Sequence, residues 1–174
     1  MKIAVTGAGH SLGKNICEVL GESHTIVHLT GKVETYQDTI LDEVKDCDVF
    51  VNCGYKDRIQ SALFRKVYLD WKYKEKTIVN ILTSALMFGS PNKKYVDDKL
   101  DLEKLSKEVR CLNKKVRIVN IYPNTLENTQ IDIEKLSFSQ VSEVIKYAIE
   151  LPHSIELFSL GISKTTLEMR RSIL

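Results

Sequence analysis

Short apolar runs alternate along the chain with longer segments in which apolar residues recur every three or four positions. The short runs predict β-strands, and the periodic segments predict amphipathic helices. Strands are expected at residues 3–5, 24–30, 47–52, 77–82, 116–122 and 155–160. Helices are expected at residues 14–20, 39–44, 59–71, 95–112 and 138–151, and residues 163–174 are expected to form a terminal helix or a tail.

The order of these elements predicts the fold class. No hairpin turn joins two predicted strands, so each connection must cross over through a helix, which makes neighbouring strands parallel. A parallel sheet is covered by helices on both faces. We therefore predict an α/β fold with a doubly wound, Rossmann-like parallel sheet, in a single domain over residues 1–174. The polar residues 34–37 leave room for only a vestigial third strand.

Such a sheet has a predictable place for a ligand. Ligands bind beyond the carboxyl ends of the parallel strands, where the connecting loops meet. The loops expected to converge on one crevice are those that follow Val5, Thr30, Asn52, Leu82 and Tyr122. We therefore look for functional residues in these loops.

A glycine-rich turn joins the first predicted strand to the first helix. Gly7, Gly9 and Gly13 give the backbone freedom to turn, and the unpaired amides that open the helix can cradle a pyrophosphate. Glycine spacing alone also fits a plain tight turn, in which Gly9 only lets the strand meet the helix. The residues of the other loops are needed to distinguish a phosphate site from a plain turn.

Composition and charge exclude several other classes of protein. The chain has 174 residues, of which 43% are hydrophobic and 28% charged, as expected for one compact core. Its net charge of +2 is spread without a basic stripe, so we expect no nucleic-acid partner. No apolar run approaches the roughly 20 residues that cross a bilayer, and no charged leader precedes the first strand. We therefore expect a cytoplasmic protein without membrane contact.

The cysteines and histidines predict neither disulfides nor a metal site. The four cysteines form no C-x-x-C pair, and the four histidines lack the spacing of metal ligands. Reduced cysteines are therefore expected.

Tyr95 and Lys99 are the first candidates for chemistry. They lie four residues apart at the start of a predicted helix, so both fall on one face. A cation beside a phenol favours the phenolate, so Lys99 and a bound nicotinamide cation would lower the pKa of Tyr95 toward neutrality. The same spacing also fits a surface tyrosine beside a solvated lysine. The preceding strand ends at Thr83 and Ser84, hydroxyls that could hold a carbonyl oxygen against Tyr95.

These motifs resemble those of the short-chain dehydrogenase/reductase family and occur in the family's order. The sequence TGAGHSLG at residues 6–13 is similar to the TGxxxGxG loop, VNCG at residues 51–54 to the NNAG strand end, and Tyr95 with Lys99 to the catalytic pair. The resemblance covers nearly the whole chain and indicates a shortened, divergent member.

The resemblance implies hydride transfer between the nicotinamide and a small carbonyl or alcohol. Tyr95 would act as the acid or base, and Lys99 would bind the ribose and tune the phenol. Thr83 or Ser84 would orient the substrate oxygen. Residues 79–81 resemble the strand that precedes the family's serine, and counting from them places Thr83 at the position of that serine. Ser84, one position later, has the residue type that the family uses. Both therefore remain candidates.

The resemblance also implies a cofactor site along the crevice. The residues expected to contact the cofactor are Gly7, Gly9, His10, Ser11, Leu12, Gly13, Thr30, Lys32, Asn52, Cys53, Gly54, Tyr95, Lys99 and Pro123. NADP is expected rather than NAD, because Thr30 and Lys32 stand where a carboxylate would bind the ribose 2′-hydroxyl. Asn52 either borders the cofactor or caps the following turn.

The chain departs from the family pattern near both ends of the expected site. Ser11 replaces the second glycine of the loop and narrows the space for a pyrophosphate. Asn124 replaces the glycine that follows Pro123 in the family. The family also has an asparagine on the helix after the NNAG strand end, and Gln60 is its nearest counterpart here. Three acidic residues are close to Lys99 in the sequence: Asp97, Asp98 and Asp101. Helical spacing is expected to point most of their side chains away from Lys99.

Two functions from different classes remain open. The first is a minimal NADP-dependent oxidoreductase, and the second is a non-catalytic dinucleotide-binding protein with a regulatory or assembly role. Retention of Tyr95, Lys99 and a hydroxyl favours the enzyme, because a binding module does not need this trio.

The resemblance further implies a homo-oligomer, either a dimer or a tetramer. Relatives associate through the helices that correspond to residues 59–71 and 95–112, and both helices carry apolar stripes here. The same stripes equally suit a core. Their residues are Leu63, Val67, Leu102, Leu105 and Val109.

Overall fold

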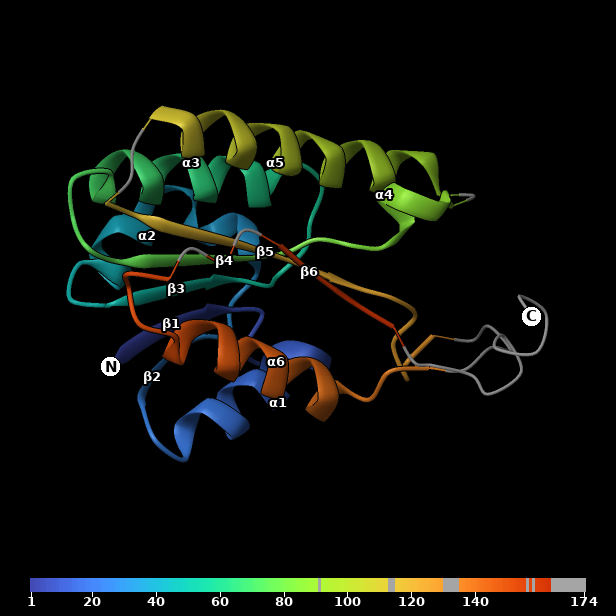
Figure 1. The fold of residues 1–174 in the computed structure, drawn as a ribbon, viewed down its shortest axis with the longest axis horizontal. Helices are drawn as coiled ribbons and strands as arrows, with labels where there is room; N and C mark the ends of the chain where they lie inside the picture. Colours follow the sequence, from blue (N-terminus) through green and yellow to red (C-terminus); the bar gives the residue numbers. More distant parts are fainter. Residues whose placement is uncertain (91, 113–114, 130–134, 156, 158, 164–174) are drawn as a thin grey trace.

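The computed structural model describes residues 1–90, 92–112, 115–129, 135–155, 157 and 159–163. These residues contain a six-stranded parallel sheet with the strand order β2-β1-β3-β4-β5-β6 (Figure 1). The strands are β1 (Lys2–Thr6), β2 (Thr25–Leu29), β3 (Val49–Asn52), β4 (Thr77–Ile81), β5 (Arg117–Pro123) and β6 (Ser159–Ile162). The predicted doubly wound, Rossmann-like fold is therefore confirmed.

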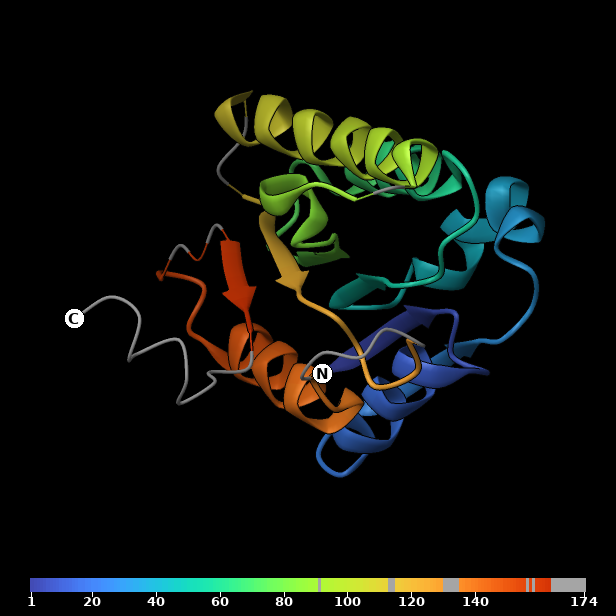
Figure 2. The ribbon, with the colours of Figure 1, turned by 90° about the vertical axis from the view of Figure 1, so that its right-hand side faces the viewer.

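Helices cover both faces of the sheet (Figures 1 and 2). On one face, α1 packs against α6; on the other, α3 packs against α2 and α5. Their bounds are α1 (Ser11–Gly21), α2 (Tyr36–Val44), α3 (Ile59–Trp71), α5 (Lys93–Leu112) and α6 (Phe138–Glu150), and two short elements are η1 (Val33–Thr35) and α4 (Ala85–Phe88). Because helices cover both faces, β3, β4 and β5 are buried at every position.

The core consists of two apolar clusters, one on each face of the sheet. Successive strand residues point to opposite faces, so Val51 and Val79 join the cluster under α1 and α6, whereas Phe50 and Ile78 join the cluster under α3 and α5. Trp71 at the end of α3 is fully buried in the second cluster. This two-sided core fixes the sheet, and with it the loops at the carboxyl ends of its strands.

The polar segment after β2 differs from the prediction. Instead of a vestigial strand, η1 and the first turn of α2 occupy residues 33–37. Thr35 closes this turn, because its Oγ1 donates to the Lys32 carbonyl at 2.6 Å and its backbone amide donates to the same oxygen at 2.9 Å. In the described part of the chain, β2 is therefore the edge of the sheet.

The last strand also begins later than predicted. Ile155 belongs to a turn in which its amide donates to the Pro152 carbonyl at 2.9 Å. Among the described residues, pairing with β5 starts at Ser159, which is in register with Asn120. The short α4 was not predicted, because four residues give too little periodicity. The terminal helix or tail expected at residues 163–174 lies outside the described residues from 164 onward.

The apolar stripes on α3 and α5 face the core. Leu63, Val67 and Leu102 are fully buried, and Leu105 and Val109 are partly buried against the same cluster. The stripes therefore pack in the core, which is one of the two roles that the sequence left open for them. None of the helices in the described part of the chain is long and apolar enough to cross a bilayer.

Candidate functional site

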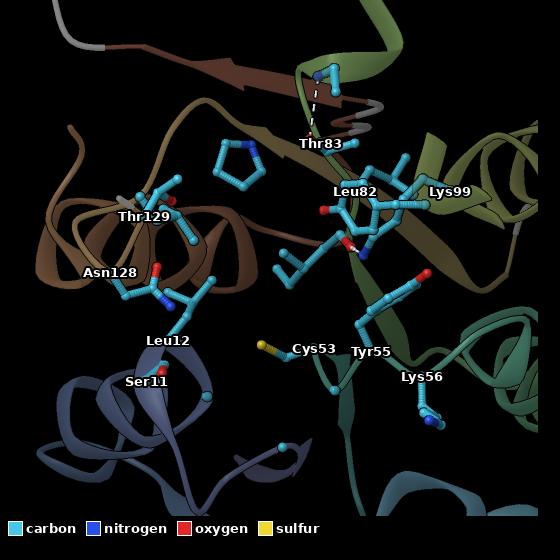
Figure 3. Close-up of a pocket in the computed structure, with 18 of the residues that line it drawn as sticks. Ser11, Leu12, Cys53, Tyr55, Lys56, Leu82, Thr83, Lys99, Asn128 and Thr129 are labelled. Carbon is cyan, nitrogen blue, oxygen red and sulfur yellow. Dashed lines mark hydrogen bonds between the residues drawn. The ribbon is translucent and has the colours of Figure 1, made fainter. Parts of the chain in front are cut away.

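A cleft of about 1230 Å³ opens at the carboxyl ends of the strands (Figure 3). The loops after β1, β2, β3, β4 and β5 line it, together with the start of α5. Its volume exceeds the ~300–1,000 Å³ that is usual for small-ligand sites, as a long ligand such as a dinucleotide requires. Every site residue predicted from the sequence lines this cleft except Gly9 and Asn52.

Three glycines allow the loops after β1 and β3 to meet backbone to backbone. Gly7 has a φ of +72°, and a Cβ added to it would lie 3.0 Å from Gly54 Cα. A Cβ on Gly13 would lie 2.2 Å from the Gly7 carbonyl oxygen. Thr6 fastens the same junction, because its Oγ1 accepts the amides of Cys53 and Gly54, both at 3.0 Å. The junction therefore cannot hold side chains at these glycines without moving backbone.

The N-terminus of α1 opens into the cleft without a cap. His10 at the N-cap makes no side-chain hydrogen bond to the helix, and the first turn has no acidic residue. Ser11 has a φ of 44°, so it adopts the left-handed conformation that glycine adopts more easily. The amides that open α1 remain available, and they fit a phosphate group.

Gly9 and Asn52 lie away from the cleft, contrary to the prediction. Gly9 borders a separate small hollow beside His28, and a Cβ added to it would make only ordinary contacts with Thr30. Asn52 is fully buried. Gly9 thus lies in the turn between β1 and α1 and does not line the cleft.

Thr83 and Ser84 face different partners. Thr83 lies close enough to the Tyr95 hydroxyl to lower its pKa, and its own hydroxyl accepts the Ala85 amide at 3.2 Å. Ser84 instead donates to Asn124 Oδ1 at 3.1 Å. Of the two hydroxyls left open by the sequence, Thr83 is the one that meets the phenol.

Lys99 lies behind Tyr95 and is only 3% exposed. Its Nζ donates to Gln60 Oε1 at 2.7 Å and to the Ile81 carbonyl at 2.6 Å. An ammonium group has three N–H donors, so one remains for a ligand in the cleft. Burial lowers the pKa of Lys99 to about 8.

A buried polar network holds Gln60 in place. Gln60 Nε2 donates to the Asn52 carbonyl at 2.8 Å, and Asn52 Nδ2 donates back to the Gln60 carbonyl at 3.0 Å. Asn52 also donates to Asn80, and Asn80 donates to Asn120, across the registered strands β3, β4 and β5. Asn52 thus braces the sheet and positions Gln60, the partner of Lys99.

The pKa of Tyr95 is raised in the chain alone, whereas the sequence led us to expect that Lys99 and a bound nicotinamide together would lower it. Burial is the main cause, and the nearby Thr83 hydroxyl opposes it. Lys99 Nζ lies 5.5 Å from the centroid of the Tyr95 ring and donates to other oxygens, so its charge is not directed at the phenol oxygen. In the chain without ligands, Tyr95 is therefore a neutral phenol.

Most of the three acidic residues around Lys99 point away as expected, and Asp98 is the exception that points inward. Its side chain is 5% exposed and accepts the Tyr55 hydroxyl at 3.0 Å, while Arg58 Nε lies 3.6 Å from its other oxygen. Asp97 is exposed and Asp101 half-exposed, as expected. Tyr55 was missed by the sequence prediction, although it directly follows the NNAG-like strand end.

The opposite end of the cleft carries the residues expected to select the cofactor. Thr30 and Lys32 are exposed in the loop after β2, and His10 is exposed above the α1 N-terminus. Glu34 also lines this end. This end of the cleft therefore carries both a positively and a negatively charged side chain.

Further lining residues were not predicted. They come from loops that follow strand ends and from the short α4, where the sequence shows no motif. They include Val33, Lys56, Phe88, Asn92, Thr125, Asn128 and Thr129. Figure 3 shows Asn128 and Thr129 across the cleft from Tyr55 and Lys99. Within the described residues, no group of three or more His, Cys, Asp or Glu side chains could hold a metal ion.

Comparisons with solved structures identify the fold. No protein-family model matches the chain, and no curated protein matches its sequence. A short-chain dehydrogenase from Burkholderia cenocepacia in complex with NADP matches with a TM-score of 0.78 and 13% identity, covering 99% of this chain and 92% of that one. A 3-ketoacyl-(acyl-carrier-protein) reductase from Brucella melitensis complexed with NADH matches with a TM-score of 0.71 and 16% identity, covering 92% and 96%. An alcohol dehydrogenase from Thermococcus sibiricus complexed with 5-hydroxy-NADP matches with a TM-score of 0.70 and 14% identity, covering 92% and 95%. The chain has the fold of the short-chain dehydrogenases and reductases.

Proposed function

We propose that this chain, which has the fold of the short-chain dehydrogenases and reductases, is an NAD(P)-dependent oxidoreductase. Its substrate would be a small carbonyl compound or alcohol. The observation that carries the proposal is the meeting of Thr83, Tyr95 and Lys99 in the cleft that the glycine-rich turn borders. A protein that only bound a dinucleotide would not need this trio.

Residues along the cleft would hold the cofactor. The uncapped α1 N-terminus would bind the pyrophosphate, since Gly7 and Gly13 keep its amides clear of side chains. The third N–H of Lys99 would bind a ribose hydroxyl. Lys32 would bind a 2′-phosphate, so we propose a preference for NADPH over NADH. When bound, the nicotinamide supplies or accepts the hydride.

The side chains suit proton transfer to a carbonyl oxygen. In the reductive direction the Tyr95 hydroxyl donates its proton to the substrate oxygen, while the carbonyl carbon gains the hydride. Thr83 Oγ1 would hydrogen bond to the same oxygen and hold it near Tyr95. The neutral state of Tyr95 fits this role, because a proton donor must begin protonated. Lys99 would stabilise the phenolate that remains.

The two neighbouring hydroxyls give a matched test. The purified protein and its variants would be incubated with NADPH and a panel of small carbonyl compounds, and nicotinamide absorbance followed. Tyr95→Phe should lower turnover by about 10²-fold or more, because it removes the proton donor. Thr83→Ala should lower turnover by about tenfold, and Ser84→Ala should stay near wild type, because Ser84 faces Asn124.

Two outcomes would overturn this assignment. Full turnover by Tyr95→Phe would remove the proposed acid. Binding of NADPH without turnover of any carbonyl or alcohol would instead favour a regulatory or assembly role on the same fold.

The proposed enzyme would act as a cytoplasmic homo-oligomer. Because the apolar stripes of α3 and α5 are core, association would use the outer surface of these helices, where Leu69 is 55% exposed. Sedimentation velocity should then give a dimer or a tetramer. A monomer at micromolar concentration would contradict this part of the proposal.

A further inference from the structure

We infer that Tyr55 is a positioning residue of the proposed active site: it packs against the ring of Tyr95 and screens Lys99 from water, and Asp98 holds it there. The inference rests on the proposed function, which gives Tyr95 and Lys99 their roles. It concerns a residue outside the motifs of the sequence, on a loop that faces the start of α5.

The contacts of Tyr55 place its ring against both groups. The centroids of the Tyr55 and Tyr95 rings are 4.9 Å apart, with an interplanar angle of 83°, which is the favoured edge-to-face arrangement. Lys99 Nζ lies 5.2 Å from the Tyr55 centroid and 5.5 Å from the Tyr95 centroid. At these distances both ring faces attract the ammonium group. Both rings therefore lie against the ammonium group, which still borders the cleft.

Asp98 fixes the position of this ring. The Tyr55 hydroxyl donates to Asp98 Oδ2 at 3.0 Å, and the Asp98 side chain is 5% exposed. Burial and the nearby carboxylate raise the pKa of Tyr55 to about 12, so the hydroxyl stays a donor at neutral pH. Asp98 is the neighbour of Lys99 on α5. The helix that carries the proposed machinery thus also carries the group that holds Tyr55.

The surroundings of Lys99 explain why the Tyr55 ring matters. Besides the two rings, the titratable groups facing Lys99 are Cys53 and Asp98, and both favour its charged form. Burial opposes them and is the largest influence on its pKa. Tyr55 is 40% exposed and Tyr95 is partly exposed, so both residues lie between the buried ammonium group and solvent. Removing the ring would let water reach the ammonium group and would free the Tyr95 ring.

A set of variants separates the ring of Tyr55 from its hydroxyl. Tyr55→Ala removes both, Tyr55→Phe keeps the ring, and Asp98→Asn removes the charge that holds the hydroxyl. Tyr73→Ala is the matched control, because Tyr73 is 72% exposed and does not line the cleft. Tyr55 is partly exposed, so its variants should fold.

The first readout is the titration of Lys99 in the protein without cofactor. NMR of protein labelled with ¹³C at lysine Cε would follow it, with Lys99→Arg identifying the signal. The wild-type signal should titrate near pH 8, the value that burial gives. Tyr55→Ala should raise this pKa toward the ordinary 10.5 by about one unit or more. Tyr55→Phe and Asp98→Asn should shift it less, and Tyr73→Ala should not shift it.

The second readout is turnover with NADPH. Tyr55→Ala should lower kcat by about 10- to 100-fold, as expected for misplaced catalytic groups, with KM for NADPH within about threefold of wild type. Tyr55→Phe should recover most of kcat.

An unchanged Lys99 titration in Tyr55→Ala would overturn the inference. So would equal losses of kcat in Tyr55→Ala and Tyr73→Ala. Failure of the proposed function is distinguishable, because it would appear as wild-type protein without turnover. The lysine titration needs no cofactor and would still decide whether Tyr55 screens Lys99.

Discussion

Lys99 is the residue whose protonation most directly links the site to pH. Its pKa is lowered by burial to about 8 in the folded chain and is near 10.5 when the chain is unfolded. Below pH 8 the ammonium is charged in both states, so the cost of burying it is fully present. Between about pH 8 and 10.5 the folded state has released the proton that the unfolded state retains. The contribution of Lys99 to the free energy of unfolding therefore rises through this interval.

We predict that the free energy of unfolding of Lys99→Met minus that of wild type is larger at neutral pH than at pH 10. The change in this difference should be on the order of 3 kcal/mol at most, because each pKa unit corresponds to about 1.4 kcal/mol. Urea denaturation across this pH range measures it. Comparing Lys99→Met with wild type at each pH removes the effects of the other titrating groups, which both proteins share. A difference that does not vary with pH would contradict the lowered pKa.

Lys32 should decide the choice between the two nicotinamide cofactors. Its exposed ammonium lies in the loop after β2, where a 2′-phosphate would bind. We expect Lys32→Ala to weaken NADPH binding about tenfold, or ~1.4 kcal/mol, through loss of a charge-assisted contact. NADH binding should change less than about twofold. Fluorescence titration measures both, and equal weakening of the two would contradict a role in phosphate selection.

Lys14→Ala is the control for this comparison. Lys14 is an exposed cation on α1 that lies outside the cleft and pairs with Glu18. Its removal changes the net charge as much as Lys32→Ala does. A similar loss of NADPH affinity in Lys14→Ala would indicate a general charge effect.

The sequence did not predict which neighbours some single side chains of the site contact. Thr83 and Ser84 are adjacent, and only the turn between β4 and α4 decides which one faces Tyr95. Asp98 lies three positions after Tyr95, so helical spacing allows it to face the same side. It is buried because Tyr55 approaches from a distant loop with a hydrogen-bond donor, and no local pattern reveals that partner.

At the scale of elements, the junction of β1 and α1 depends on one glycine and tolerates change at another. A Cβ on Gly13 would lie 2.2 Å from the Gly7 carbonyl oxygen, whereas a Cβ on Gly9 would lie 3.6 Å from its nearest neighbour. We expect Gly13→Ala to lower the free energy of unfolding by about 1–3 kcal/mol, because the backbone must shift. Gly9→Ala should stay within about 0.5 kcal/mol of wild type.

Urea denaturation and NADPH titration of this pair test the junction. Gly13→Ala should also weaken NADPH binding, since the amides at the start of α1 would move with the helix. Equal stability of the two variants would contradict the close approach of α1 to β1.

The strands differ in how far the sequence predicts them. Central strands such as β3 and β5 are buried at every position, so their apolar runs are clear. The edge strand β6 is exposed at Ser159 and Gly161, which removes that signal, and pairing with β5 sets where it starts. The segment at η1 is polar, so its pattern did not separate a short strand from a helical turn.

At the scale of the whole molecule, the cleft exists because one parallel sheet brings five loops together. The sequence predicted this convergence from the alternation of strands and helices, and nearly all of its site residues line the cleft. It did not predict how the loops contact one another. Gln60 on α3 reaches Lys99 on α5, and Tyr55 reaches α5 from the loop after β3. These contacts depend on the packing of elements far apart in the sequence.

The most direct test of the central proposal is a titration of the purified protein with NADPH and NADH, followed by nicotinamide fluorescence. If the cleft is a nicotinamide-dinucleotide site, both cofactors should bind saturably, NADPH should bind more tightly, and the difference should disappear in Lys32→Ala. Failure of both cofactors to bind to folded protein would contradict the proposed function.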